Sequence, residues 1–128
     1  MVEQGFRAGD PLYRLSQLKV QLRTITNSII DQAIHVDGMS QQEMMTLLTQ
    51  TAFQEEREAA GKWRRAQLSF TQLSTYFVGF QEHLETRAAA RAKQGAGFNL
   101  KLYHDEVLSY GSPPGRFARQ LLLDEPIQ

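Results

Sequence analysis

The chain has 128 residues, which is enough for one domain with a buried core and too few for two independent domains. Its 14 basic and 14 acidic residues cancel, so no overall field attracts a nucleic acid or an anionic membrane. Cysteine is absent, which excludes disulfides, thiolate zinc sites and cysteine nucleophiles and is consistent with a reducing compartment.

Hydropathy and the first residues predict a cytoplasmic protein. No apolar run approaches the roughly 18 residues needed to span a bilayer. The segment Met1–Arg7 lacks the basic-then-apolar order of a secretory signal. We expect no membrane and no nucleic-acid partner. We expect residues 1–9 to form a disordered tail, residues 10–123 a single helical domain, and residues 124–128 a second tail.

The first predicted element is a long N-terminal helix. Asp10-Pro11 is a start signal, because aspartate can cap free backbone N–H groups and proline suits the first helical position. Apolar residues then recur every three or four positions and line one helical face. They are Leu12, Leu15, Leu18, Leu22, Ile25, Ile29 and Ala33. Gly38 predicts that the helix ends near His35 or Val36.

A second helix follows at once. Ser40-Gln-Gln-Glu43 is a capping box, in which the serine and glutamate side chains each bond the other residue's backbone N–H. The buried stripe of this helix is expected at Met44, Leu47 and Leu48. Residues 53–67 form a third segment, and the sequence leaves open whether it continues the second helix or breaks from it near Thr51.

Capping residues, glycines and prolines in the rest of the sequence predict three more helices. The fourth runs over about residues 72–93, and Gly95-Ala-Gly97 ends it. Asn99 caps a short fifth helix that Gly111 closes, and Ser112-Pro113 opens the last helix. No window alternates with a period of two. The predicted fold is therefore all-α, a bundle or array of about five to six helices with one long N-terminal helix and one long central helix.

Histidine and serine offer little catalytic chemistry here. His35, His83 and His104 fall on three different predicted helices, and none forms the His-x-x-x-His spacing that places two nitrogens on one face for zinc. We expect them to be surface or interhelical hydrogen-bonding groups. No Gly-x-Ser-x-Gly elbow exists. The basic cluster Lys62-Trp-Arg-Arg65 is interpreted as a solvated face rather than a nucleic-acid site.

Tyr76 is the strongest candidate for a functional side chain. It stands one position before the apolar stripe of the fourth helix, near Gly79, whose missing side chain permits a close backbone approach. A phenol at the edge of a core can donate a hydrogen bond to an oxyanion that develops on a substrate. The alternative is a core-edge tyrosine bonded to a backbone carbonyl.

A series of short motifs along the chain resembles a bacterial family known as domain of unknown function 885. The motifs cover nearly the whole chain in the expected order. They are Arg14-Leu-x-x-Leu-Lys19, Leu22-Arg23, Ile30-Asp31, Ile34-His35, Gly38-Met-Ser40, Ala52-Phe-Gln-Glu-Glu56, Lys62-Trp63, Arg65-Ala66, Gln72-Leu-Ser-Thr-Tyr76, Gly79, Phe98, His104-Asp105, Leu108 and Gly111-Ser-Pro113.

The resemblance implies a relation to helical zinc metallopeptidases of the His-Glu-x-x-His type. In such proteins the zinc ligands and the general-base glutamate lie upstream of the region that this chain matches. The resemblance therefore implies zinc for the full-length family and no metal site in this chain. It implies that Tyr76 helps to hold a tetrahedral intermediate, and that Arg23, Asp31 and His35 orient substrate or brace the site. A purely structural Asp–His or Asp–Arg brace between helices is the alternative for these three residues.

Two functional hypotheses follow. In the first, the chain is the C-terminal helical part of a zinc-peptidase-like protein, lines its cleft and is catalytically incomplete alone. In the second, it is a stand-alone helical interaction module that self-associates. The first predicts exposed apolar surface, because helices that pack on the missing half lose their cover, and a monomer without a sizeable apolar patch would favour the self-contained module. The expected partner is a second copy in a homodimer or the missing zinc-binding half, with a peptide as the possible substrate. A complete small enzyme that uses Tyr76 with His35 or His104 is disfavoured.

Overall fold

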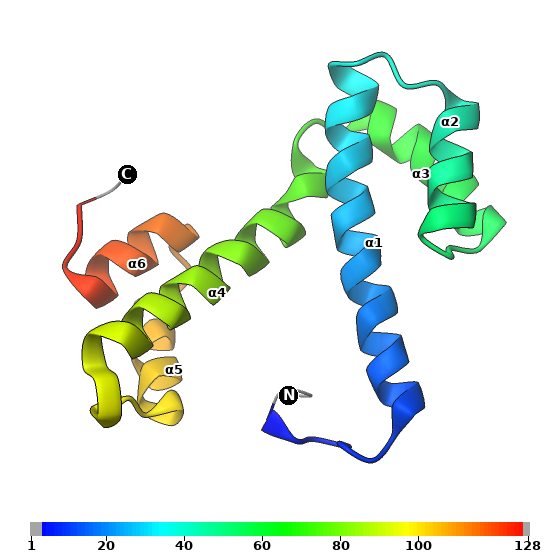
Figure 1. Cartoon of the computed structure of the whole chain (residues 1–128). Helices are drawn as coiled ribbons and strands as arrows, with labels where there is room; N and C mark the ends of the chain where they lie inside the picture. The colour runs from blue at the N-terminus through cyan, green and yellow to red at the C-terminus, as the bar shows by residue number, and fades with distance from the viewer. Residues whose placement is uncertain (1–3, 127–128) are drawn as a thin grey trace. The chain divides into compact units, whose positions relative to one another are not determined.

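A computed structural model describes residues 4–126, which contain helices and turns and no strand. Six α-helices occur in this part of the chain, so the all-α prediction is confirmed (Figure 1). They are α1 (Pro11–His35), α2 (Gln41–Thr46), α3 (Glu56–Leu68), α4 (Thr75–Gln94), α5 (Leu100–Ser109) and α6 (Gly115–Leu123). Their lengths of 25 residues for α1 and 20 for α4 confirm the long N-terminal and central helices.

Three short turns connect these helices. A π-helical turn, η2 (Leu47–Thr51), extends α2, and two 3₁₀ turns, η3 (Gln72–Ser74) and η4 (Gly95–Gly97), flank α4. The chain separates into two compact units, Met1–Phe77 and Val78–Gln128, where the sequence predicts one helical domain over residues 10–123. The backbone of residues 4–9 forms turns rather than a featureless tail, and the Phe6 ring packs edge-on against Tyr13.

The predicted helix caps are present. The Asp10 carboxylate accepts hydrogen bonds from the backbone N–H groups of Leu12 and Tyr13, at 3.0 and 3.2 Å. Ser40 and Glu43 form the complete capping box, and the Asn99 side chain caps α5. These bonds supply partners for N–H groups that the first helical turn leaves unpaired.

The structure decides where two helices begin. The third helix does not continue the second: Phe53 adopts a left-handed φ of 53°, and α3 begins only at Glu56. The last helix begins at Gly115, three residues after the predicted Ser112. The cause is the second proline, Pro114, which forces the residue before it into extended backbone and delays the helix.

The first unit has its core where α1, α2 and α3 meet. Its buried residues come from these three helices and from the turns η2 and η3: Ile30, Met44, Leu48, Ala59, Ala66 and Leu73. Trp63 and Leu47 pack against this cluster from its edge. The second unit has a smaller core, in which Ala90, Tyr103 and Leu123 join α4, α5 and α6.

The apolar stripe of α1 is not buried along its whole length. Ile30 is fully buried, and Thr26 and Ala33 are nearly so, because the C-terminal half of α1 packs on α3 and η3. Leu12 and Leu15 are 71% and 61% exposed. The stripe therefore continues beyond the part of α1 that its own unit covers.

Candidate functional site

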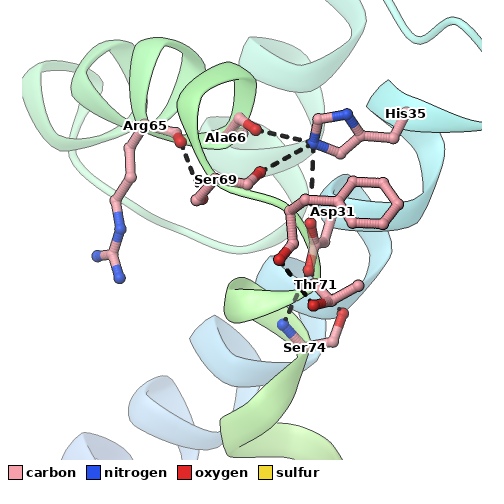
Figure 2. Close-up of polar contacts among 8 residues, drawn as sticks. Asp31, His35, Arg65, Ala66, Ser69, Thr71 and Ser74 are labelled. Carbon is pink, nitrogen blue, oxygen red and sulfur yellow. Dashed lines mark hydrogen bonds and ion pairs between the residues drawn. The ribbon is translucent and has the colours of Figure 1, made fainter.

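The candidate site is built around Asp31, a buried carboxylate on α1. Its side chain is only 3% exposed. Asp31 Oδ2 accepts hydrogen bonds from the backbone N–H of Ser74, at 3.1 Å, and from the Ser74 hydroxyl, at 2.9 Å (Figure 2). Ser74 directly precedes α4, so a negative charge lies at the N-terminus of that helix, where the helix dipole stabilises it. Asp31 thus fixes the start of α4 to α1.

His35 lies one turn further along α1 and binds the end of α3. Its Nε2 atom is 2.8 Å from the Ala66 carbonyl oxygen and 3.0 Å from the Ser69 carbonyl oxygen. A carbonyl oxygen can only accept, so Nε2 carries the proton and donates to both. Figure 2 shows the imidazole facing these two carbonyls, with Asp31 beside it, and the same Nε2 is 4.0 Å from Asp31 Oδ1. The Phe70 ring packs edge-on against the imidazole, 5.1 Å between centroids.

Asp31, which is buried, and His35, whose side chain is 21% exposed, together form what we call the brace, because they tie α1 to both ends of the α3–α4 connection. Asp31 Oδ1 has no hydrogen-bond partner within the described part of the chain. The geometry of the brace matches the structural alternative that the sequence left open. A substrate-binding role for these two residues stays a prediction.

Tyr76 projects from the first turn of α4, two residues after the Ser74 anchor. It is 69% exposed, and its hydroxyl makes no hydrogen bond within residues 4–126. This removes the alternative of a core-edge tyrosine bonded to a backbone carbonyl. The expected close approach at Gly79 is also absent from the described residues, since a Cβ there would meet no atom within 4 Å. Tyr76 is therefore a free phenol on a fixed support.

Arg23 lies on α1, outside the brace. Its guanidinium forms an ion pair with Glu58 of α3, at 2.5 Å, and both side chains are over a third exposed. Glu58 also lies 3.6 Å from Lys62 Nζ. Arg23 is the charged end of a second polar connection between α1 and α3.

That connection includes a buried lysine that the sequence did not indicate. Lys62 is 8% exposed, and its ammonium donates a hydrogen bond to the Gln54 side-chain oxygen. The Gln54 amide donates in turn to the Thr26 hydroxyl, at 3.1 Å. Burial lowers the pKa of Lys62, Glu58 opposes that effect, and Arg23 adds to it. The prediction of a solvated basic face is wrong at Lys62, although its i,i+4 spacing from Glu58 was a usable signal.

The histidines do not assemble a metal site. His83 and His104 line one pocket of about 220 Å³ in the second unit, beside the buried Tyr103, whose burial raises its pKa. His35 belongs to the brace in the first unit. Within residues 4–126 no three side chains of the types that ligate metals come together. The donor set of the described residues does not fit a zinc ion.

The described residues form an all-α chain in which the exposed Tyr76 follows Ser74, the partner of the buried Asp31. The chain belongs to the family described as bacterial protein of unknown function (DUF885), whose model matches residues 1–122. The resemblance inferred from the sequence motifs is thereby confirmed at the level of the family.

A solved structure shares this fold. The chain is 42% identical to a protein described as a putative lipoprotein of unknown function from Shewanella oneidensis, with a TM-score of 0.93. The match covers 96% of this chain and 22% of that protein, so the chain spans about a fifth of the neighbour's length. A comparison with curated proteins gave no match. No helix among the described residues is both long and apolar enough to span a bilayer.

Proposed function

We propose that this chain is a helical part of a zinc-peptidase-like protein, catalytically incomplete alone, in which it holds Tyr76 at the wall of a substrate cleft. The single observation that carries the proposal is that an exposed phenol lies two residues after a serine held by a buried carboxylate. Tyr76 is open to solvent, while the helix that bears it is fixed through Asp31 and Ser74. A catalytic side chain has to be held in its productive position, and rigid secondary structure provides that support.

The chemistry of Tyr76 follows from its phenol. A neutral hydroxyl can donate a hydrogen bond to the oxyanion that forms when a peptide carbonyl is attacked. Such a donor stabilises the transition state only if its position is set before the reaction, and the brace provides that positioning. In this proposal the metal ligands and the general base come from another part of the longer protein, since no three metal-ligating side chains come together within residues 4–126.

Arg23, Asp31 and His35 receive positioning roles in this proposal. Asp31 and His35 hold the α3–α4 connection, and Arg23 holds α3 to α1 through Glu58. Their loss would move Tyr76 rather than remove a group that touches substrate. The isolated chain is accordingly expected to hydrolyse nothing, and the longer protein is expected to act on peptides.

The experiment uses a chimera in which this chain replaces the matching segment of the Shewanella oneidensis protein. Peptide hydrolysis is measured with added zinc for the chimera, for its Tyr76→Phe variant and for the isolated chain. Loss of one oxyanion donor predicts that Tyr76→Phe lowers kcat by about 100-fold or more. Tyr13→Phe is the matched control, because Tyr13 lies on α1 against Phe6 and away from the brace.

The proposal fails if the zinc-loaded chimera cleaves no peptide, if Tyr76→Phe retains full activity, or if the isolated chain hydrolyses peptides. A second candidate is the self-associating interaction module, which the exposed large apolar side chains of the chain as a whole favour. Light scattering of the isolated chain tests it: a stable dimer together with an inactive chimera would support the module instead.

The location of the protein is a separate proposal. A cytoplasmic location stays a proposal. The solved neighbour is described as a putative lipoprotein, which is the alternative to test. Fractionation of bacterial cells that express this protein from its own gene distinguishes the two locations.

A further inference from the structure

α1 carries an uncovered apolar face. We define this face as Leu12, Leu15, Leu18, Ile25 and Ile29, which recur at helical spacing and are between 38% and 71% exposed. Towards the C-terminal end of α1, the adjoining positions Thr26 and Ile30 are buried against the first unit's own core. A continuous aliphatic stripe of this length is rarely left open to water.

Between residues 11 and 30 the charged side chains of α1 are all basic. From residue 11 to residue 30 the helix contains Arg14, Lys19 and Arg23 and no aspartate or glutamate. At a rotation of about 100° per residue, Arg14 falls on one edge of the apolar face and the other two on the opposite edge. The face is therefore an aliphatic stripe with a cation on both sides.

A small pocket adjoins the second edge. It has a volume of about 260 Å³ and is lined by Ser16, Lys19, Val20, Arg23 and Gln54. Arg23 already pairs with Glu58, whereas Lys19 makes no ion pair within the described residues. Gln54 is 6% exposed and belongs to the polar connection that ends at Lys62. A carboxylate that entered this pocket would meet an ammonium, a guanidinium and a hydroxyl.

The sign of these charges selects the occupant. When two copies of α1 pack face to face, in either direction, a basic edge of one copy lies against a basic edge of the other. Like charges placed together at an interface oppose association. The face also lacks the tryptophan and phenylalanine that anchor helices at lipid surfaces. A protein segment with aliphatic side chains and acidic flanks complements both the aliphatic stripe and the cations on its two edges.

We propose that the apolar face of α1 docks a segment of the longer family protein that lies outside this chain, and that an acidic side chain of that segment enters the Lys19–Arg23 pocket. The inference deepens the proposed function, because it rests on the chain being one part of a longer protein. The neighbour's length supports it, since this chain matches 22% of that protein.

Hydrogen exchange tests the proposal. Amides of residues 12–25 are compared between the isolated chain and the chimera with the Shewanella oneidensis protein, and the docked state predicts exchange at least about tenfold slower in the chimera. Leu15→Asp should leave the thermal midpoint of the isolated chain unchanged, because Leu15 is 61% exposed there. In the chimera it should lower the midpoint and restore fast exchange in α1.

Controls separate docking from general destabilisation. Gln17→Asp places the same charge on the opposite side of α1 and should change neither protein. Leu15→Ala removes apolar area without adding charge, and it serves if Leu15→Asp prevents the chimera from folding. It should then lower the thermal midpoint of the chimera and speed the exchange of α1 amides by a smaller amount. Lys19→Glu reverses the charge of the pocket and should also restore fast exchange in the chimera.

Three results would overturn the proposal. Equal exchange of α1 in the isolated chain and the chimera would show that nothing covers the face. A dimer of the isolated chain that Leu15→Asp dissociates would assign the face to a second copy. Binding of the isolated chain to phosphatidylglycerol vesicles, lost in Leu15→Asp, would assign it to a membrane. None of these readouts uses peptide cleavage, so a protected α1 in an inactive chimera refutes the proposed function alone.

Discussion

Replacing Asp31 with alanine should destabilise the first unit more than any other single change in the brace. The Asp31 carboxylate accepts from both the backbone N–H and the hydroxyl of Ser74. Alanine leaves both donors without that partner at the start of α4. It also removes the negative charge from the N-terminus of that helix.

The magnitude follows from these two bonds. Hydrogen bonds to a charged group contribute about 1.5–3 kcal/mol each to stability. Removal of a buried carboxylate also relieves part of its desolvation penalty, which offsets some of that loss. The expected net cost of Asp31→Ala is about 2–3 kcal/mol. Asp31→Asn keeps one acceptor for Ser74 and should cost roughly 1 kcal/mol.

The assay uses the single tryptophan, Trp63, which packs against the core of the first unit. Urea unfolding followed by its fluorescence reports on that unit, and a loss of this size lowers the midpoint by about 1.5 M when the denaturant slope is near 1.5 kcal/mol per M. Asp37→Ala is the control, because Asp37 is exposed two residues beyond the end of α1. Its effect should stay within about 0.5 kcal/mol.

The reasoning would be refuted if Asp31→Ala unfolded at the same urea concentration as the wild-type chain and the Asp37 control. It would also be refuted if Asp31→Asn cost as much as Asp31→Ala, because the loss would then come from the charge and not from the bonds to Ser74.

The other predictions concern the polar connection and the core. Burial lowers the pKa of Lys62 below its ordinary 10.5, so the unfolded chain binds more protons between the lowered pKa and about 10.5. The folded state should therefore gain stability as pH rises through that window. The unfolding free energy of the wild-type chain should rise relative to that of Lys62→Met over the same pH range. A difference in unfolding free energy that stays constant with pH would contradict this. Leu48→Ala removes a fully buried side chain and should cost about 2–5 kcal/mol by the same fluorescence assay. Leu68→Ala, at a residue 82% exposed, is its control, and equal losses at the two positions would refute the core assignment.

The helices could be predicted because their signals are local. Asp10, Ser40 and Asn99 each bond a backbone N–H two or three residues away, so the sequence alone contains both partners. The delayed start of α6 was predictable in principle from Pro114, since the restriction on the residue before a proline also acts locally.

The candidate site could be predicted only in part. Motif resemblance singled out Arg23, Asp31, His35 and Tyr76, and the structure brings Asp31 and His35 together in one brace. Their partners were not identified, because Ser74 lies 43 residues from Asp31 and Ala66 lies 31 residues from His35. The burial of Lys62 was missed for the same reason, since it depends on Gln54 and Thr26 from two other segments.

By itself the sequence determined the helical class, the positions of the caps and the family, because capping, periodicity and motif order are properties of neighbouring residues. Only the tertiary structure decided which part of the α1 stripe is covered and which part stays open, and that Tyr76 faces solvent while Asp31 does not. Burial is set by segments tens of residues apart. A repeat of leucines that looks uniform along one helix can therefore be core at one end and exposed surface at the other.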